Sequence, residues 1–147
     1  MGGENMGGLL RIWWVLPLLA LILSACARAE PRPGEARIPK DAVITHRAVF
    51  IGTNNHDTTG TISLYQSRSY PVIVFEPNFS VSDAAGAMVA LGTDGYRADT
   101  VLGGLLRSSG RQVYALPRDL DLRRFNEVWL WSPYADKPIG LARLTAI

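Results

Sequence analysis

The chain has 147 residues, with 15 Lys and Arg against 13 Asp and Glu, a formal net charge of +2 and a single cysteine. One cysteine excludes an intramolecular disulfide, and together with only two histidines it cannot supply a structural zinc site of the usual kind. The charge is also too balanced for the clustered basic face that nucleic-acid binding needs. We therefore expect no nucleic-acid partner, no metal and no cofactor.

An apolar run near the start of the chain predicts where the protein resides. One basic residue, Arg11, precedes the apolar stretch 12–23, and small residues follow it. This order is typical of a secretory signal peptide. Roughly 12 apolar residues rise only ~18 Å as a helix, which is less than the ~30 Å of hydrocarbon in a bilayer. The stretch is therefore expected to be a signal rather than a permanent membrane span.

The end of this run, Leu23-Ser24-Ala25-Cys26, resembles the lipobox of bacterial lipoproteins. The resemblance implies a signal peptide over 1–25, cleavage before Cys26, and lipid on its thiol and new amino group, which anchors the chain stably. The cell envelope is then the expected location, and Ala27 in place of aspartate favours the outer membrane by family analogy. The alternative is a plain secretory signal cut at the A-x-A-like Ala25-Cys26-Ala27, which leaves a soluble protein.

Residues 26–40 are expected to hold the lipidated cysteine and a disordered tether. Residues 27–40 contain three prolines and almost nothing apolar, a composition typical of disorder. They also carry four basic and two acidic residues, whereas residues 41–147 carry ten of each. The tether's positive charge would favour anionic lipid headgroups near the anchor.

From Asp41 onward, short apolar runs separated by turn residues predict one all-β domain over 41–147. Val72–Phe75 is continuously apolar and is expected to be buried on both faces, and Phe79 is expected to fill the core. Residues 117–125 could hold one helical turn with Leu120, Leu122 and Phe125 facing inward. About seven or eight strands predict a small β-sandwich or barrel. The expected strands lie at 48–51, 61–65, 72–75, 88–92, 112–116, 128–131 and 139–144.

The order of motifs adds a family resemblance. The chain reads GTISLY at 60–65, MVALG at 88–92, SGRQVYALP at 109–117, VWLW at 128–131 and IGLARL at 139–144. Together these resemble the electron-transfer DM-thirteen domain family, a small all-β extracytoplasmic module, over roughly residues 46–146.

The resemblance implies an electron-transfer role that depends on a cysteine directly after the VWLW strand. That position is Ser132 in this chain. A hydroxyl does not ionise near neutral pH, form disulfides or pass through sulfenic states as a thiolate does. Redox chemistry by the domain's own thiol is therefore not expected.

Four aromatic residues form the strongest remaining pattern: Trp129, Trp131, Tyr114 and Tyr134. The two tryptophans share one face of their strand, while Val128 and Leu130 share the other. Layers packed on both faces would make the aromatic residues part of the core, which is the interpretation we favour. Alternatively, the tryptophan face forms an exposed platform for a ligand or a partner protein.

The histidines, glycines and serines give weaker signals. His56-Asp57 lies in a polar turn that lacks the spacing of a calcium loop, so a structural turn is expected. His46 is expected at the surface or at a sheet edge. Gly103-Gly104 lacks the residues of a phosphate loop and is interpreted as a bend. Ser108-Ser109 has no nucleophile-elbow context, although sequence alone leaves a dispersed hydrolase triad open.

The sequence favours a lipid-anchored, non-enzymatic binding or accessory module that serves an unidentified protein partner, for which a redox protein is one candidate. Its candidate ligand or partner surface comprises His56, Tyr114, Trp129, Trp131 and Tyr134. The alternative is an electron carrier with a bound haem or metal, for which the candidate ligands are His46, His56 and Met88. A hydrolase is the third class.

Overall fold

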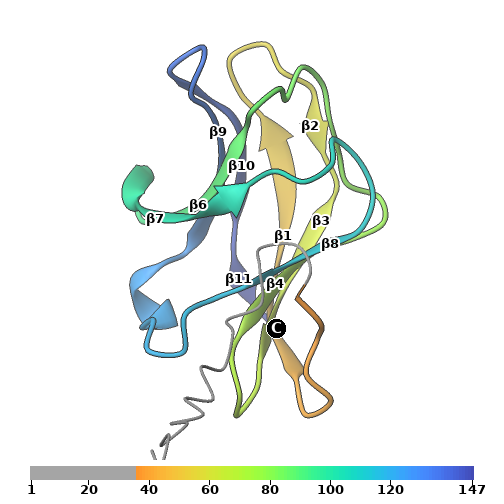
Figure 1. Cartoon of the computed structure of the whole chain (residues 1–147), viewed down its shortest axis with the longest axis vertical. Helices are drawn as coiled ribbons and strands as arrows, with labels where there is room; N and C mark the ends of the chain where they lie inside the picture. The colour runs from red at the N-terminus through yellow and green to blue at the C-terminus, as the bar shows by residue number, and fades with distance from the viewer. Residues whose placement is uncertain (1–35) are drawn as a thin grey trace, which may run out of the picture.

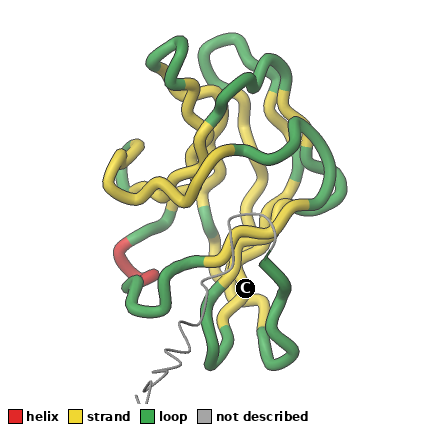
Figure 2. The backbone as a smooth tube through the Cα atoms, viewed as in Figure 1, coloured by secondary structure: helices red, strands yellow, loops and turns green. Residues whose placement is uncertain are grey.

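The computed structural model describes residues 36–147, so the predicted signal peptide, Cys26 and the predicted tether as far as residue 35 lie outside the described residues. The described chain is almost entirely β (Figure 1). One 3-10 helix interrupts the strands (Figure 2, red). The elements are β1 Val43–Gly52, β2 Thr58–Thr59, β3 Thr61–Gln66, β4 Val72–Phe75, β5 Ser80–Val81, β6 Met88–Gly92, β7 Tyr96–Gly104, β8 Gln112–Ala115, η1 Leu122–Arg124, β9 Glu127–Ser132, β10 Lys137–Arg143 and β11 Thr145–Ala146.

Antiparallel pairing joins eight strands in the order β7-β6-β9-β10-β1-β3-β4-β8, and β11 adds to β1. The sheet curls into a nearly closed, barrel-like shape whose two end strands are β7 and β8 (Figure 1). The small pair β2-β5 forms a separate two-stranded sheet. This arrangement confirms the predicted all-β barrel or sandwich.

Four aromatic rings fill the interior of the barrel. Phe75 contacts Phe79, Phe50 and Tyr114 at ring-centroid distances of 4.8, 5.3 and 5.2 Å, in tilted or edge-on geometries that aromatic pairs prefer. All four side chains are buried, which confirms the predicted core position of Phe79. The apolar residues of the predicted helical turn, Leu120, Leu122 and Phe125, also pack against this core.

Strand β4 is buried on both faces, as predicted. Ile73 and Phe75 face the barrel interior. Val72 and Val74 face outward and are covered by the N-terminal segment, defined here as residues 36–41. Ala36 is buried there and Ile38 packs beside it, so the packed part of the chain includes residues that the sequence assigned to the tether. The proline-rich composition of the tether did not predict this packing, because only the side chains of Ala36 and Ile38 contribute to it.

Strand β7 is absent from the sequence prediction, and Gly103-Gly104 lies at its end rather than in an isolated bend. Its pattern is hidden by a bulge: Ala90 pairs with Val101 and Gly92 with Tyr96, so four residues of β7 oppose one of β6. Extra residues of this kind break the alternation that identifies a strand. Strand β1 is also longer than predicted, because its first half pairs with β3 and β11.

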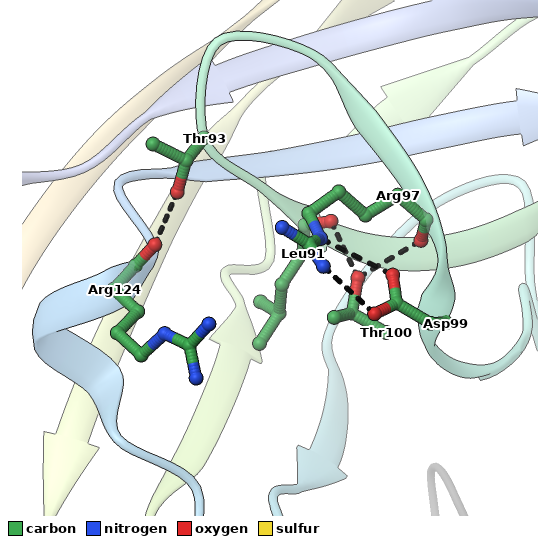
Figure 3. Close-up of polar contacts among 6 residues, drawn as sticks. All are labelled: Leu91, Thr93, Arg97, Asp99, Thr100 and Arg124. Atoms are coloured by element: carbon green, nitrogen blue, oxygen red, sulfur yellow. Dashed lines mark hydrogen bonds and ion pairs between the residues drawn. The ribbon is translucent and has the colours of Figure 1, made fainter.

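Short polar contacts hold the bulge (Figure 3). Arg97 pairs with Asp99 at 2.8 Å. The hydroxyl of Thr100 donates to the Leu91 carbonyl at 2.7 Å, which closes the bulge onto β6. Nearby, the hydroxyl of Thr93 donates to the Arg124 carbonyl and joins the β6–β7 turn to η1.

Candidate functional site

Strand β9 presents two different faces. Val128 and Leu130 point inward and are fully buried, whereas Trp129 and Trp131 point outward and are half-buried. The predicted core position is therefore wrong for both tryptophans and correct for Tyr114. The barrel interior already holds four aromatic rings, so the smaller Val and Leu side chains occupy the inward positions.

The indole of Trp129 is fixed by Glu127, two residues before it on the same face. Oε2 of Glu127 accepts hydrogen bonds from the indole N–H and from the backbone N–H of Gly95, both at 3.0 Å. The carboxylate is almost completely buried, and its other oxygen lies 3.3 Å from Nε of the exposed Arg143. The ring lies directly over Gly92, where an added Cβ would approach the indole nitrogen to 2.5 Å. Position 92 therefore requires glycine.

Trp131 stacks on Tyr96. The ring centroids are 4.3 Å apart and the planes differ by 18°. Tyr96 is the first residue of β7 and reaches the tryptophan from across β6. The stack holds both rings in a fixed orientation while leaving each of them half-buried.

Two exposed aliphatic side chains extend this surface onto β1. The strand register aligns Ile51 with Leu141, Leu141 with Trp129, and Trp129 with Ala90, so these residues share one face of four adjacent strands. Val49 lies two residues before Ile51 on the same face, and the two are 63% and 64% exposed. We call Val49, Ile51, Tyr96, Trp129 and Trp131 the outer face.

Of the outer face, the sequence pattern indicated only the two tryptophans. Val49 and Ile51 alternate with the buried Ala48 and Phe50, and this alternation was a usable signal for an exposed aliphatic pair. Tyr96 could not be found in this way, because it belongs to the bulged strand β7.

Ser132 lies within the wall of the barrel. It follows Val128 and Leu130 on the inward face and is buried. Its hydroxyl accepts a hydrogen bond from the Ala135 backbone N–H at 3.3 Å, which helps to form the β9–β10 turn. A side chain at this position is therefore shielded from solvent.

Tyr134 occupies that same turn and is 84% exposed, so its predicted core position is wrong. Its ring lies against the α-carbon of Gly86, where a Cβ would come within 2.4 Å of a ring carbon. His56 lies in the β1–β2 loop, with Nδ1 3.4 Å from the Ser82 carbonyl oxygen. Neither residue belongs to the outer face.

Tyr114 is a core residue with a structural hydroxyl. The hydroxyl donates to Oε1 of the buried Gln112 at 2.9 Å, and burial raises the pKa of Tyr114 to about 12. Gln112 also accepts from the Leu106 N–H at 3.2 Å and donates to the Arg107 carbonyl at 2.9 Å. These two side chains therefore hold the β7–β8 loop, and Tyr114 is not part of a ligand surface.

The candidate haem or metal ligands lie on separate elements. His46 is on β1 opposite Ala146, His56 is in a loop, and Met88 is on β6 opposite Trp131. Within residues 36–147, no group of three or more His, Cys, Asp or Glu side chains is arranged to hold a metal ion. No helix in that same range is long and apolar enough to cross a membrane.

Comparison with known proteins adds no relative: no family model, no curated protein and no solved structure matches this chain. The resemblance to the DM-thirteen family therefore stays a prediction from the motifs.

Proposed function

We propose that this chain is a lipid-anchored, extracytoplasmic binding module of the DM-thirteen type, and that its outer face binds a protein partner in the cell envelope. The proposal rests on one observation above all. Trp129, Trp131 and Tyr96, which are half-buried, and the more exposed Val49 and Ile51 place hydrophobic side chains from β9, β7 and β1 on the outside of the barrel. Interfaces between proteins are enriched in tryptophan and tyrosine, and these residues carry much of the binding energy.

The rigidity of the outer face supports binding. Trp129 is held by a buried carboxylate and Trp131 by a parallel stack, so neither ring loses much rotational freedom when a partner covers it. Pre-ordered side chains lower the entropic cost of association. The surface also carries a charged margin, formed by Arg143 beside Glu127, which would contribute to the choice of partner.

The outer face lies on the outside of the barrel wall, which suits a macromolecule better than a small ligand, because a small ligand needs a concave pocket. We therefore propose a non-enzymatic role, and the partner could be a redox protein of the same compartment. Direct electron transfer through a thiol is not proposed, because Ser132 replaces the family cysteine and is buried.

Photocrosslinking in the native cell tests the outer face. A photoreactive phenylalanine analogue at Val49 should give one adduct of defined mass larger than the chain, and Ile51→Glu in the same chain should remove it. The matched control is the analogue at Leu106, an exposed apolar residue outside the outer face, which should give no such adduct. An adduct of twice the chain mass would show self-association instead, and no adduct at Val49 would refute the partner surface.

The anchor is tested separately. Cys26→Ser should abolish labelling with a fatty-acid analogue and release a soluble or unprocessed product. A variant that stays membrane-bound with unchanged mass would refute the lipoprotein assignment.

An ultraviolet–visible spectrum with metal analysis, on residues 27–147 purified from their native compartment, tests the role itself. A binding module should show only aromatic absorption. A Soret band or stoichiometric metal would replace this proposal with a cofactor-based electron carrier, and His46, His56 and Met88 would then be the residues to mutate.

A further inference from the structure

Three segments that are distant in sequence meet at the end of the barrel near η1. The amide N–H of Arg68, in the β3–β4 turn, donates to Asp41 at 3.0 Å, and the Tyr70 hydroxyl donates to the Arg37 carbonyl at 3.1 Å. The Leu116 N–H donates to the Pro71 carbonyl at 2.9 Å. The N-terminal segment, the β3–β4 turn and the residues around η1 are therefore in contact (Figure 1, lower end).

These segments concentrate positive charge. Within 36–41, 66–71 and 116–124 there are six basic residues and three acidic ones, a net charge of +3. The remaining described residues hold six basic and seven acidic side chains, a net charge of −1. We call this region the basic end. Its cations are Arg37, Lys40, Arg68, Arg118, Arg123 and Arg124, and all six are exposed.

The acidic residues of the basic end are partly engaged. Asp121 pairs with Arg123 at 2.9 Å and caps η1. Asp41 accepts a hydrogen bond from the backbone N–H of Arg68, and the Arg68 side chain is exposed. The exposed cations are therefore only partly compensated by local acids.

A solvent-open hollow of about 320 Å³ lies within the basic end. Its lining includes Gln66, Ser67, Leu122 and Arg118, together with the ion pair of Arg123 and Asp121. It thus combines the guanidinium of Arg118 with polar and apolar side chains and with an ion pair whose guanidinium is already partnered by Asp121. Guanidinium groups are well suited to phosphate oxygens.

The proposed lipid anchor at Cys26 would place a membrane surface near the basic end. Cys26 precedes Ala36 by ten residues, and ten residues span at most ~36 Å whatever their conformation. The N-terminal segment that continues from this connection is itself part of the basic end. If Cys26 carries lipid, a bilayer surface always lies within reach.

We propose that the basic end docks on anionic phospholipid headgroups, so that the domain lies against the membrane in one orientation. This inference rests on the proposed lipid anchor for its physiological setting. Each Lys or Arg near an anionic surface strengthens association roughly 5-fold. Four or more exposed cations acting together are therefore enough to keep a tethered domain docked most of the time.

Amide hydrogen exchange on the full lipidated chain in vesicles tests the docking. Vesicles with phosphatidylglycerol should slow exchange in 66–71 and 117–124 relative to vesicles of phosphatidylcholine alone, and 0.5 M salt should remove the difference because it screens exposed charges. The triple variant Arg37→Ala, Arg68→Ala and Arg118→Ala should lose the protection, with binding weakened roughly 100-fold.

The matched control is Arg107→Ala with Arg111→Ala, which also removes exposed positive charge but outside the basic end, and it should keep the protection. Equal exchange in both kinds of vesicle, or equal loss in control and test variants, would overturn the docking. Failure of the anchor is detected separately, as an unmodified mass and no sedimentation with neutral vesicles. The difference in exchange between anionic and neutral vesicles decides the docking in either case.

Discussion

Replacement of Glu127 probes the link between the fold and the outer face most directly. One oxygen of this buried carboxylate accepts two hydrogen bonds, from the Trp129 indole and the Gly95 backbone. Glu127→Ala leaves both donors without their partner, and a hydrogen bond to a charged group contributes ~1.5–3 kcal/mol. The lost contact with Arg143 adds little, because Arg143 is 68% exposed.

The buried charge itself costs free energy, so its removal offsets part of the loss. We expect Glu127→Ala to lower the free energy of unfolding by about 3 kcal/mol. Glu127→Gln should cost only about 1 kcal/mol, since both hydrogen bonds reach the same oxygen and an amide oxygen can still accept them.

Urea unfolding of residues 27–147, followed by tryptophan fluorescence and circular dichroism, measures both values. Asp57→Ala is the control, because it removes an exposed carboxylate in the β1–β2 loop and should leave the midpoint unchanged. The reasoning is refuted if Glu127→Ala costs less than about 1 kcal/mol, or if the Ala and Gln variants lose the same stability. Either result would mean that Trp129 is held by packing alone.

Three further predictions concern other parts of the barrel. Because the pKa of Tyr114 is about 12 when folded and near 10 when unfolded, stability should fall as pH rises from 10 to 12, and pH-dependent unfolding should show a smaller fall in Tyr114→Phe. Gly60→Ala should destabilise by more than about 2 kcal/mol in denaturant unfolding, because φ is +109° and a Cβ would lie 2.4 Å from the Phe79 Cα. Ser132→Cys, in a chain that also carries Cys26→Ser, should react with a maleimide far more slowly when folded than in denaturant, since position 132 is buried. Equal rates would contradict that burial.

The sequence predicted those elements whose apolar pattern has one interpretation. Val72–Phe75 is apolar at four successive positions, so burial on both faces followed directly. The apolar residues of 117–125 were likewise placed correctly against the core.

Prediction failed where two patterns competed. In β9 both faces are apolar, and only the volume already filled by aromatic rings inside the barrel decides that Val128 and Leu130 point inward. Tyr134 was predicted to lie in the core because it is aromatic. It lies instead in the exposed turn between β9 and β10.

The candidate sites depend on long-range contacts that no local pattern encodes. Tyr96 reaches Trp131 only because β7 returns beside β6, and the four-residue bulge hides that strand. The basic end is assembled from three segments, each of which carries only a net charge of +1. Composition therefore gave a neutral domain, while the fold separates its charges in space.

The bulge in β7 also bears on how neighbouring chains would behave on one membrane. An end strand of an open sheet offers unpaired backbone groups to any chain beside it, and tethering to a surface raises the frequency of such encounters. In β7 the run of backbone groups is interrupted at residues 97–100, and the Arg97–Asp99 pair adds exposed charge at that point. If Cys26 tethers these domains to one surface, the same irregularity that concealed the strand from sequence patterns would hinder their edge-to-edge aggregation.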